Sequence, residues 1–495
     1  MSEAAATAPE PATEPAPPAL VADRLADFSD KLSPMLVKEL RQGLRAKTFV
    51  IVFLTLQGLL LLVLLSAVAG SANPQRAGDT ISGIIFMFFA LAVLVIQPVR
   101  GIGSLHREVQ ARTIELMVLT RLSAWKIVLG KWISIVSQSA LLLAAIIPYL
   151  ILRYWFGDMN LFGELSLMVL TFIASAVLTA VIIGISCVPS VLLRGLVPLI
   201  AAAFGLILIP QLCFDREFDE MIDFAAMQTP ASFWGVLLTV LSALYLGWTA
   251  LGIGASMIAP AAENHTTIKR LVSALLLILL IPVAAYAPIP QEAVALLVCI
   301  LGIPALVLAL TEPFMLLPPV CAPFLKRGPF GLLAGRVLYP GWPSGVLFSL
   351  IVVGLAAASV YFAVRGGSYP GFDLVLFSIL GALLMPAAII SFFDRKLKNR
   401  LTTYLLVLAA STIVAFVVAF IAGSLPMGQR GFLWFFAWLP QTGIVMESLE
   451  PEFDVWKVRL TMIWVASGYG LLLLPAAFLR FREIRKIESE LIERG

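Results

Sequence analysis

Residues 48–70 read TFVIVFLTLQGLLLLVLLSAVAG, a stretch that contains no charged side chain. A transmembrane helix needs about 20 predominantly apolar residues to cross about 30 Å of hydrocarbon, and this stretch is long enough. Eleven similar runs follow it along the chain. The twelve expected spans are Thr48–Gly70, Ile81–Val99, Ile133–Leu152, Leu165–Val188, Gly195–Phe214, Phe233–Ile258, Leu271–Pro288, Ala293–Leu310, Val346–Val364, Leu374–Phe393, Leu401–Ile421 and Leu460–Leu479.

The composition of the whole chain agrees with these runs. Of its 495 residues, 60% are hydrophobic and 13% are charged, against about 45–50% and about 25% in soluble domains. A soluble enzyme, a disordered protein and a nucleic-acid binder are therefore excluded. The four cysteines are far apart and only two histidines occur, so we expect neither a disulfide framework nor a metal site. The sequence predicts an all-α polytopic membrane helical bundle with about 12 transmembrane helices.

The distribution of charge predicts the orientation of the chain. With the N-terminus inside, only Arg76, Arg153, Arg216, Arg365, Arg430, Lys457 and Arg459 of the 34 basic residues lie outside. Cytoplasmic loops carry the excess of Lys and Arg in membrane proteins. We therefore expect a multi-pass protein of the cytoplasmic (inner) membrane with both termini in the cytoplasm.

Long loops recur with a period of six spans, which indicates a six-plus-six arrangement. The alternative is a six-span core followed by an unrelated six-span extension. We predict a disordered Ala/Pro-rich tail over residues 1–30, a first unit over 31–260, a second over 261–480, and a charged cytoplasmic helix over 481–495.

Residues 33–45, SPMLVKELRQGLR, read as a short amphipathic helix before the first span. Ser33-Pro34 is typical of a helix start. Apolar Leu36, Val37, Leu40 and Leu44 share one face, and Lys38, Arg41, Gln42 and Arg45 share the other. Such a helix can lie in the membrane interface with its basic side toward the headgroups. A plain basic anchor beside the membrane is the alternative.

An energy source is missing from the chain itself. Carriers driven by ion gradients usually hold ionisable groups near the bilayer centre, and the expected spans carry none there. The only Gly-Lys pair, Gly130-Lys131, is followed by Trp132, so no G-x-x-x-x-G-K-[ST] phosphate-binding loop is present. We expect no enzyme activity, no catalytic residue and no cofactor in this chain, and any ATP hydrolysis must occur in a partner.

The loop over residues 100–131 is the most informative stretch. It contains Arg107-Glu108, then Thr113-Ile114-Glu115-Leu116, then Leu122-Ser123, and ends in Ile127-Val128-Leu129-Gly130-Lys131. These motifs resemble the coupling-helix loop of type-2 (exporter-type) ABC transporter permeases, and residues 33–45 resemble the elbow helix of that family. The resemblance covers roughly residues 33–260. An ordinary charged loop is the alternative.

The resemblance implies an exporter-type permease subunit that uses a separate ATPase subunit, which binds ATP and Mg. It implies ATPase-coupling roles for Glu108, Arg112, Thr113, Glu115, Arg121, Gly130 and Lys131, and an elbow helix with Pro34, Lys38, Glu39, Arg41 and Arg45. Arg112 stands where the family usually has Gly, and Arg121 where it often has Pro, so both departures add positive charge. Partners would be the ATPase, membrane lipid and a second permease, as a homodimer or a heterodimer, with no nucleic acid. A single chain that supplies both halves is the alternative to a dimer of chains.

Two other classes of function stay open. A secondary carrier would transport without ATP and would lose activity with an ionophore. A non-transporting membrane scaffold, or an enzyme embedded in the membrane, would need a different site. The sequence indicates neither the substrate nor the direction of transport.

Overall fold

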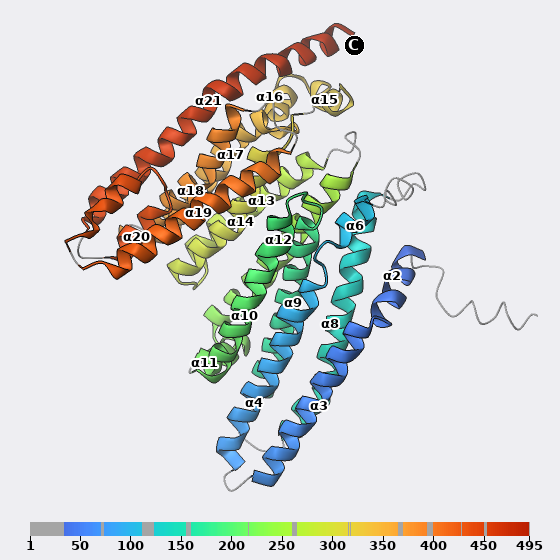
Figure 1. The fold of residues 1–495 in the computed structure, drawn as a ribbon. Helices are drawn as coiled ribbons and strands as arrows, with labels where there is room; N and C mark the ends of the chain where they lie inside the picture. Colours follow the sequence, from blue (N-terminus) through green and yellow to red (C-terminus); the bar gives the residue numbers. More distant parts are fainter. Residues whose placement is uncertain are drawn as a thin grey trace, which may run out of the picture.

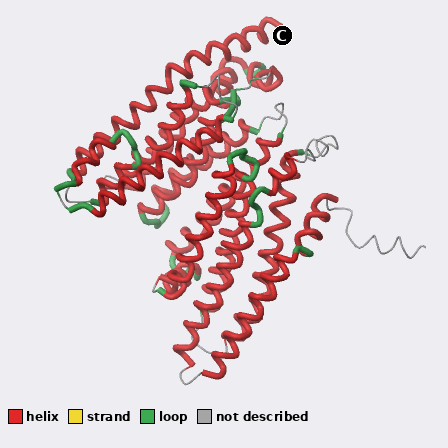
Figure 2. The backbone as a smooth tube through the Cα atoms, in the orientation of Figure 1, coloured by secondary structure: helices red, strands yellow, loops and turns green. Residues whose placement is uncertain are grey.

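The computed structural model describes residues 34–70, 74–110, 123–154, 160–215, 217–259, 265–314, 316, 318–364, 370–393, 399–426, 428–449 and 453–494. Within these ranges the secondary structure is helical and no strand occurs (Figure 2). In the part of the chain that the structure describes, twelve helical segments are long and apolar enough to cross a membrane. The predicted all-α polytopic bundle is confirmed.

Each predicted span coincides with one of these twelve segments. The first six are α3 (Lys47–Gly70), α4 (Pro74–Ala90) continued by the π-helix η1 (Leu91–Ile96) and α5 (Gln97–Val99), α8 (Ala124–Tyr154), α9 (Leu161–Ile185), the π-helix η2 (Leu192–Leu196) with α10 (Val197–Phe214), and α12 (Pro230–Ile258). The last six are α13 (Thr266–Tyr286), α14 (Gln291–Thr311), α17 (Trp342–Val364), α18 (Pro370–Ser391), α19 (Arg400–Ser424) and α21 (Val455–Arg494).

Short helices lie at the two ends of the spans. One end, which we call the terminal face, carries α2 (Pro34–Leu44), α6 (Ser104–Gln110), α15 (Pro318–Leu325), α16 (Gly328–Leu338) and the last turns of α21 (Figure 1). The opposite end, the far face, carries α11 (Glu217–Ala225), the 3-10 helix η4 (Arg430–Phe436) and α20 (Thr442–Ser448). Both ends of the described chain therefore lie on the terminal face.

Local sequence signals explain where two of the spans begin. Asn160 Oδ1 accepts a hydrogen bond from Gly163 N at 3.1 Å and caps α9. Thr229 and Ser232 form a capping box at the start of α12, with Pro230 at the first helical position. These side chains satisfy backbone N–H groups that a helix leaves unpaired at its start.

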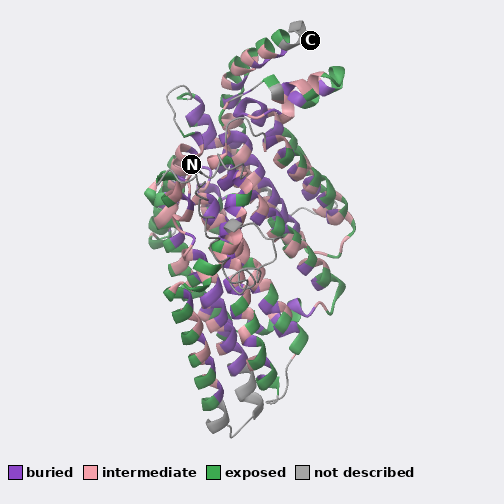
Figure 3. Ribbon diagram, turned by 90° about the vertical axis from the view of Figure 1, so that its right-hand side faces the viewer, coloured by how far each residue is buried: buried purple, intermediate pink, exposed green. Residues whose placement is uncertain are grey.

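The first and last six spans form two groups, which diverge away from the terminal face in Figure 1. Contacts between α12 and α14 join them. In each group the fourth and sixth spans pack extensively on each other, α9 on α12 and α18 on α21, and a short far-face helix, α11 or α20, packs on the fourth span. Figure 3 shows buried residues running through the interior, with exposed residues on the outer surfaces.

Backbone contact between spans depends on small residues. A Cβ atom added at Gly184 on α9 would lie 2.3 Å from the carbonyl oxygen of Ala250 on α12, and one at Gly345 on α17 would lie 1.8 Å from that of Ala309 on α14. Small residues at helix crossings are typical of membrane bundles, because lipid tails supply no hydrophobic drive and close packing must hold the helices together.

The charged C-terminal segment expected over 481–495 is continuous with the last span. Helix α21 runs from Val455 to Arg494, and its end packs on α15. Ile484 is fully buried there against Cys321 and Tyr339, and Arg336 donates to Glu488 Oε2 at 2.9 Å. The tail predicted over residues 1–30 lies outside the described residues. The duplication and the other predicted domain limits stay predictions.

Candidate functional site

Helix α2, the predicted elbow helix, packs against the third span α8. Ser134 Oγ on α8 donates a hydrogen bond to the carbonyl oxygen of Glu39 at 2.9 Å. A Cβ atom at Gly43 would lie 2.5 Å from Gln138 Nε2 and 2.7 Å from Ser134 Oγ. A side chain at position 43 would therefore have to displace these two side chains, because α2 approaches α8 closely along one face.

The ammonium group of Lys131 joins three helices at the terminal face. Its Nζ lies 2.6 Å from Oε1 of Glu108 on α6 and 3.5 Å from Oε1 of Glu39 on α2. The side chain of Lys131 is only 10% exposed, and those of the two glutamates about 20%. We call Glu39, Glu108 and Lys131 the three-helix node. Partial burial makes these charges interact more strongly than a fully hydrated surface pair would.

A row of polar side chains continues from the node into the bilayer. Lys131, Ser134 and Gln138 are spaced i, i+3 and i+7 along α8, so they lie on one face. Gln138 Nε2 donates to the carbonyl oxygen of Ser134 at 2.9 Å, and its Oε1 accepts from Arg100 Nη1. Arg100 also donates to Gln97 Oε1 at 2.7 Å. These bonds tie the end of the second span to the third.

Helix α6 is fixed against the spans by burial and by one backbone bond. Leu105 is fully buried in a cluster that includes Ile127, Ile183 and Ala255. Its backbone N–H donates to Ser186 Oγ at 3.4 Å. Packing therefore positions Glu108 independently of its ion pair.

Cys187 lies just after α9, close enough to α6 for Glu108 to affect its titration. Burial, and after it the negative charge of Glu108, raise the pKa of the Cys187 thiol to about 12. A thiol reacts as its thiolate, so the raised pKa makes Cys187 a poor nucleophile at neutral pH. It also makes the thiol a chemical reporter of the charge at position 108.

The structure brings together three of the residues predicted for coupling and for the elbow, namely Glu39, Glu108 and Lys131. Gly130 is a buried position on α8 where an added Cβ atom would meet nothing within 4 Å. Lys38, Arg41 and Arg45 are exposed on the terminal face, and Pro34 begins α2. The predicted residues Arg112, Thr113, Glu115 and Arg121 lie outside the described residues.

Sequence reasoning missed the polar residues that surround the node. Ser134, Gln138, Arg100 and Gln97 make the hydrogen bonds that connect α2, α5 and α8. The i, i+3, i+7 spacing of Lys131, Ser134 and Gln138 in an otherwise apolar helix was the signal that could have found two of them. Arg100 and Gln97 come from another span, and their meeting with Gln138 depends on how the helices pack.

A second polar cluster lies at the terminal face of the last six spans. Arg270 on α13 donates to Glu312 Oε2 at 2.8 Å and to the carbonyl oxygens of Val337, Tyr339 and Gly341 at 2.8–3.0 Å. Its side chain is 4% exposed. One guanidinium, with its several donors in a fixed plane, thus holds the chain that leads from α16 into α17. This arrangement is a structural clamp.

A third pair, Arg153 and Glu164, lies buried at the far ends of α8 and α9. Arg153 Nη2 is 3.7 Å from Glu164 Oε1, which also accepts a hydrogen bond from Ser82 Oγ at 3.0 Å. The Arg153 side chain is 1% exposed and that of Glu164 8%. This pair fixes the far ends of the second, third and fourth spans to one another.

Comparison with known proteins adds no family assignment. No family model, no curated protein and no solved structure matches the chain.

Proposed function

We propose that the chain is the membrane-spanning permease subunit of an ATP-binding cassette transporter and that a separate ATPase subunit docks on its terminal face. The observation that carries the proposal is the three-helix node. Glu108 precedes residues 111–122 and Lys131 follows them, and their side chains meet at 2.6 Å. The two ends of this loop are thereby joined at its base, where the elbow helix α2 also contacts them through Glu39.

The three-helix node is well placed to transmit force from residues 111–122 to the spans. A soluble partner that pushes on residues 111–122 would act on α6 and α8 together, because an ion pair and buried packing couple them. The push would reach α2 through Glu39 and the second span through Gln138 and Arg100. Packed side chains and hydrogen bonds between rigid helices are the physical route by which such coupling travels.

Charge on the terminal face supports an acidic or mixed-charge docking partner. Lys38, Arg41 and Arg45 are exposed on α2, and the sequence adds Arg112 and Arg121 in the loop. By the positive-inside rule this face lies in the cytoplasm, where ATP is available. We therefore place both termini in the cytoplasm and the protein in the cytoplasmic membrane.

Affinity purification from the native membrane tests the proposal. The wild-type chain should co-purify a protein that contains an ATP-binding cassette and hydrolyses Mg-ATP. Glu115→Arg should reduce its recovery at least tenfold, because it reverses a charge on the proposed docking loop. Glu292→Arg, an equal charge reversal at the exposed far-face start of α14, is the matched control and should retain the ATPase. Normal recovery with Glu115→Arg, or transport that ignores ATP depletion and stops with an ionophore, would contradict the proposal.

A further inference from the structure

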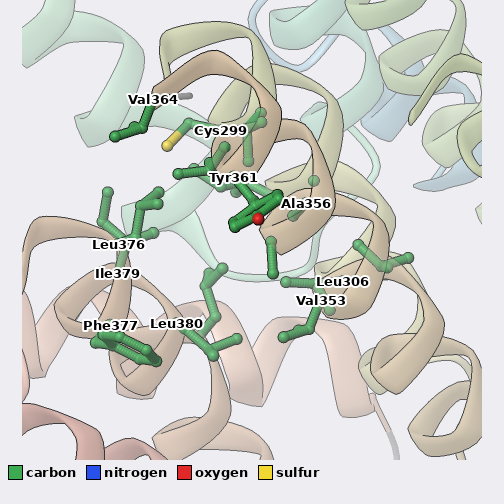
Figure 4. Close-up of a pocket in the computed structure, with 17 residues that line it drawn as sticks. Cys299, Leu306, Val353, Ala356, Tyr361, Val364, Leu376, Phe377, Ile379 and Leu380 are labelled. Carbon is green, nitrogen blue, oxygen red and sulfur yellow. The ribbon is translucent and has the colours of Figure 1, made fainter. Parts of the chain in front are cut away.

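An apolar cavity lies among α14, α17 and α18, away from the three-helix node (Figure 4). Its volume is about 470 Å³, within the range of about 300–1,000 Å³ that is typical of ligand pockets. The side chains that line it are aliphatic or aromatic except for the Cys299 thiol and the Tyr361 hydroxyl. Figure 4 shows the labelled α18 residues Leu376 and Ile379 across from Tyr361 and Ala356 of α17.

The cavity exists because α17 and α18 separate. Among the described residues, each packs along α14 and α21 and neither packs closely on the other. Small residues on the cavity wall, Gly302, Ala356 and Ala357, deepen the space. An empty apolar cavity deprives its lining atoms of dispersion contacts, so an apolar occupant would be stabilised there.

The depth of the cavity matches one leaflet of a bilayer. Along α17 its lining runs from Val352 to Val364, which is about 18 Å at 1.5 Å per residue. Half of a hydrocarbon core is about 15 Å. Val364 ends α17 at the far face, so the cavity spans the leaflet on that side.

The polarity of the cavity lining also changes from the far face toward the bilayer centre. Tyr361 lies one turn from the far-face end of α17 and is 74% exposed. Toward the bilayer centre the lining is wholly aliphatic, as at Leu306 and Leu383. A phenol is well suited to the boundary between apolar tails and polar headgroups. An occupant with a polar end near Tyr361 and a long apolar tail would fit.

We propose that this cavity binds one acyl chain of a phospholipid from the far-face leaflet, with the glycerol region beside Tyr361. The lining residues belong to spans that bilayer lipids would surround, so the ligand needs no other source. The site is independent of the proposed coupling function, because it lies in the last six spans and its test measures bound lipid.

Native mass spectrometry with added palmitoyl-oleoyl phosphatidylglycerol tests the proposal. Ala356→Trp fills the cavity from α17, and Leu350→Trp places the same side chain at an exposed position of the same helix outside the cavity. Wild type and Leu350→Trp should each bind one phospholipid more than Ala356→Trp. Equal numbers of lipids in all three proteins, or a loss in Leu350→Trp as well, would overturn the proposal.

A second variant distinguishes a filled cavity from misfolding of Ala356→Trp. An added Cβ atom at Gly302 would meet only Val352 Cγ1, at 4.0 Å, so a side chain can begin there without a clash, and Gly302→Leu fills the cavity from α14. It should lose the same lipid and should also lose the rise in melting temperature that phospholipid gives to the wild type. In the last measurement, palmitate is supplied alone in place of the phospholipid. If palmitate binds and the phospholipid does not, the site takes free fatty acid and the phospholipid assignment is wrong.

Discussion

Lys131 Nζ lies 2.6 Å from Glu108 Oε1, so residues that flank the loop 111–122 meet at its base. The same ammonium lies 3.5 Å from Glu39 of α2. One cation therefore holds two carboxylates from two other helices, and this relationship has consequences for stability, for the elbow helix and for a nearby thiol.

Removing the ammonium should destabilise the fold. Lys131→Met leaves the Glu39 and Glu108 carboxylates together without a counter-charge, and we expect a loss of about 2 kcal/mol, below the cost of breaking a fully buried pair because this site keeps some exposure. Thermal unfolding in detergent measures it. Lys126→Met changes an exposed lysine on the same helix and should have little effect. Adding Glu108→Gln to Lys131→Met should restore part of the loss, and equal stability of Lys131→Met and wild type would contradict the role of the node.

A side chain at position 43 should loosen α2 from α8. Gly43→Leu must displace Gln138 Nε2 and Ser134 Oγ, which lie 2.5 and 2.7 Å from the added Cβ position. Tryptic cleavage after Arg41 and Arg45 should become several-fold faster than in wild type. The control is Gly58→Leu on α3, where an added Cβ atom meets nothing within 4 Å. Cleavage at the wild-type rate in Gly43→Leu would show that α2 does not depend on this contact.

The crossing of α9 and α12 should tolerate no added methyl group. Gly184→Ala places a Cβ atom 2.3 Å from the Ala250 carbonyl oxygen, and a backbone atom cannot move without shifting a helix. We expect destabilisation of about 1–3 kcal/mol, the usual cost of overpacking. Gly247→Ala on α12 is the control, since its Cβ position is open. Equal melting temperatures of the two variants would show that the helices separate more easily than the packing indicates.

Cys187 should report the charge at position 108. Its thiol pKa is raised to about 12 by burial and then by Glu108, so a variant with Cys187 as its only cysteine should react slowly with maleimide at pH 8 and faster only as the pH approaches 12. Glu108→Gln removes a charge that raises the pKa. The thiolate fraction, and with it the labelling rate at pH 8, should therefore increase. Glu39→Gln is the matched control and should change the rate less; a larger effect of Glu39→Gln would contradict the assignment.

The sequence predicted the twelve spans well because an apolar run long enough to cross a bilayer is a local property. It placed Glu39, Glu108 and Lys131 among the candidate residues through separate motifs. Their meeting could not be read from the sequence, since it depends on how α2, α6 and α8 pack. The same limit applies to two other pairs. Arg100 and Gln138 are 38 residues apart in the sequence, and Arg270 and Glu312 are 42 residues apart.

The cavity among α14, α17 and α18 could not be predicted from the sequence either. Its lining residues are apolar, as are most residues in the spans, and periodicity does not distinguish a residue that faces a cavity from one that faces lipid. Only the separation of α17 from α18 shows the difference.

A charge swap at the node tests the proposed coupling most directly. The chain and its co-purified ATPase are reconstituted in lipid vesicles, and Mg-ATP hydrolysis is measured for wild type, Glu108→Lys, and Glu108→Lys combined with Lys131→Glu. We predict that Glu108→Lys lowers hydrolysis at least tenfold and that the swap, which restores opposite charges at the 2.6 Å contact, recovers most of it. No ATPase bound to the wild type, or full hydrolysis in Glu108→Lys, would contradict the proposal that an ATPase drives this chain through residues 111–122.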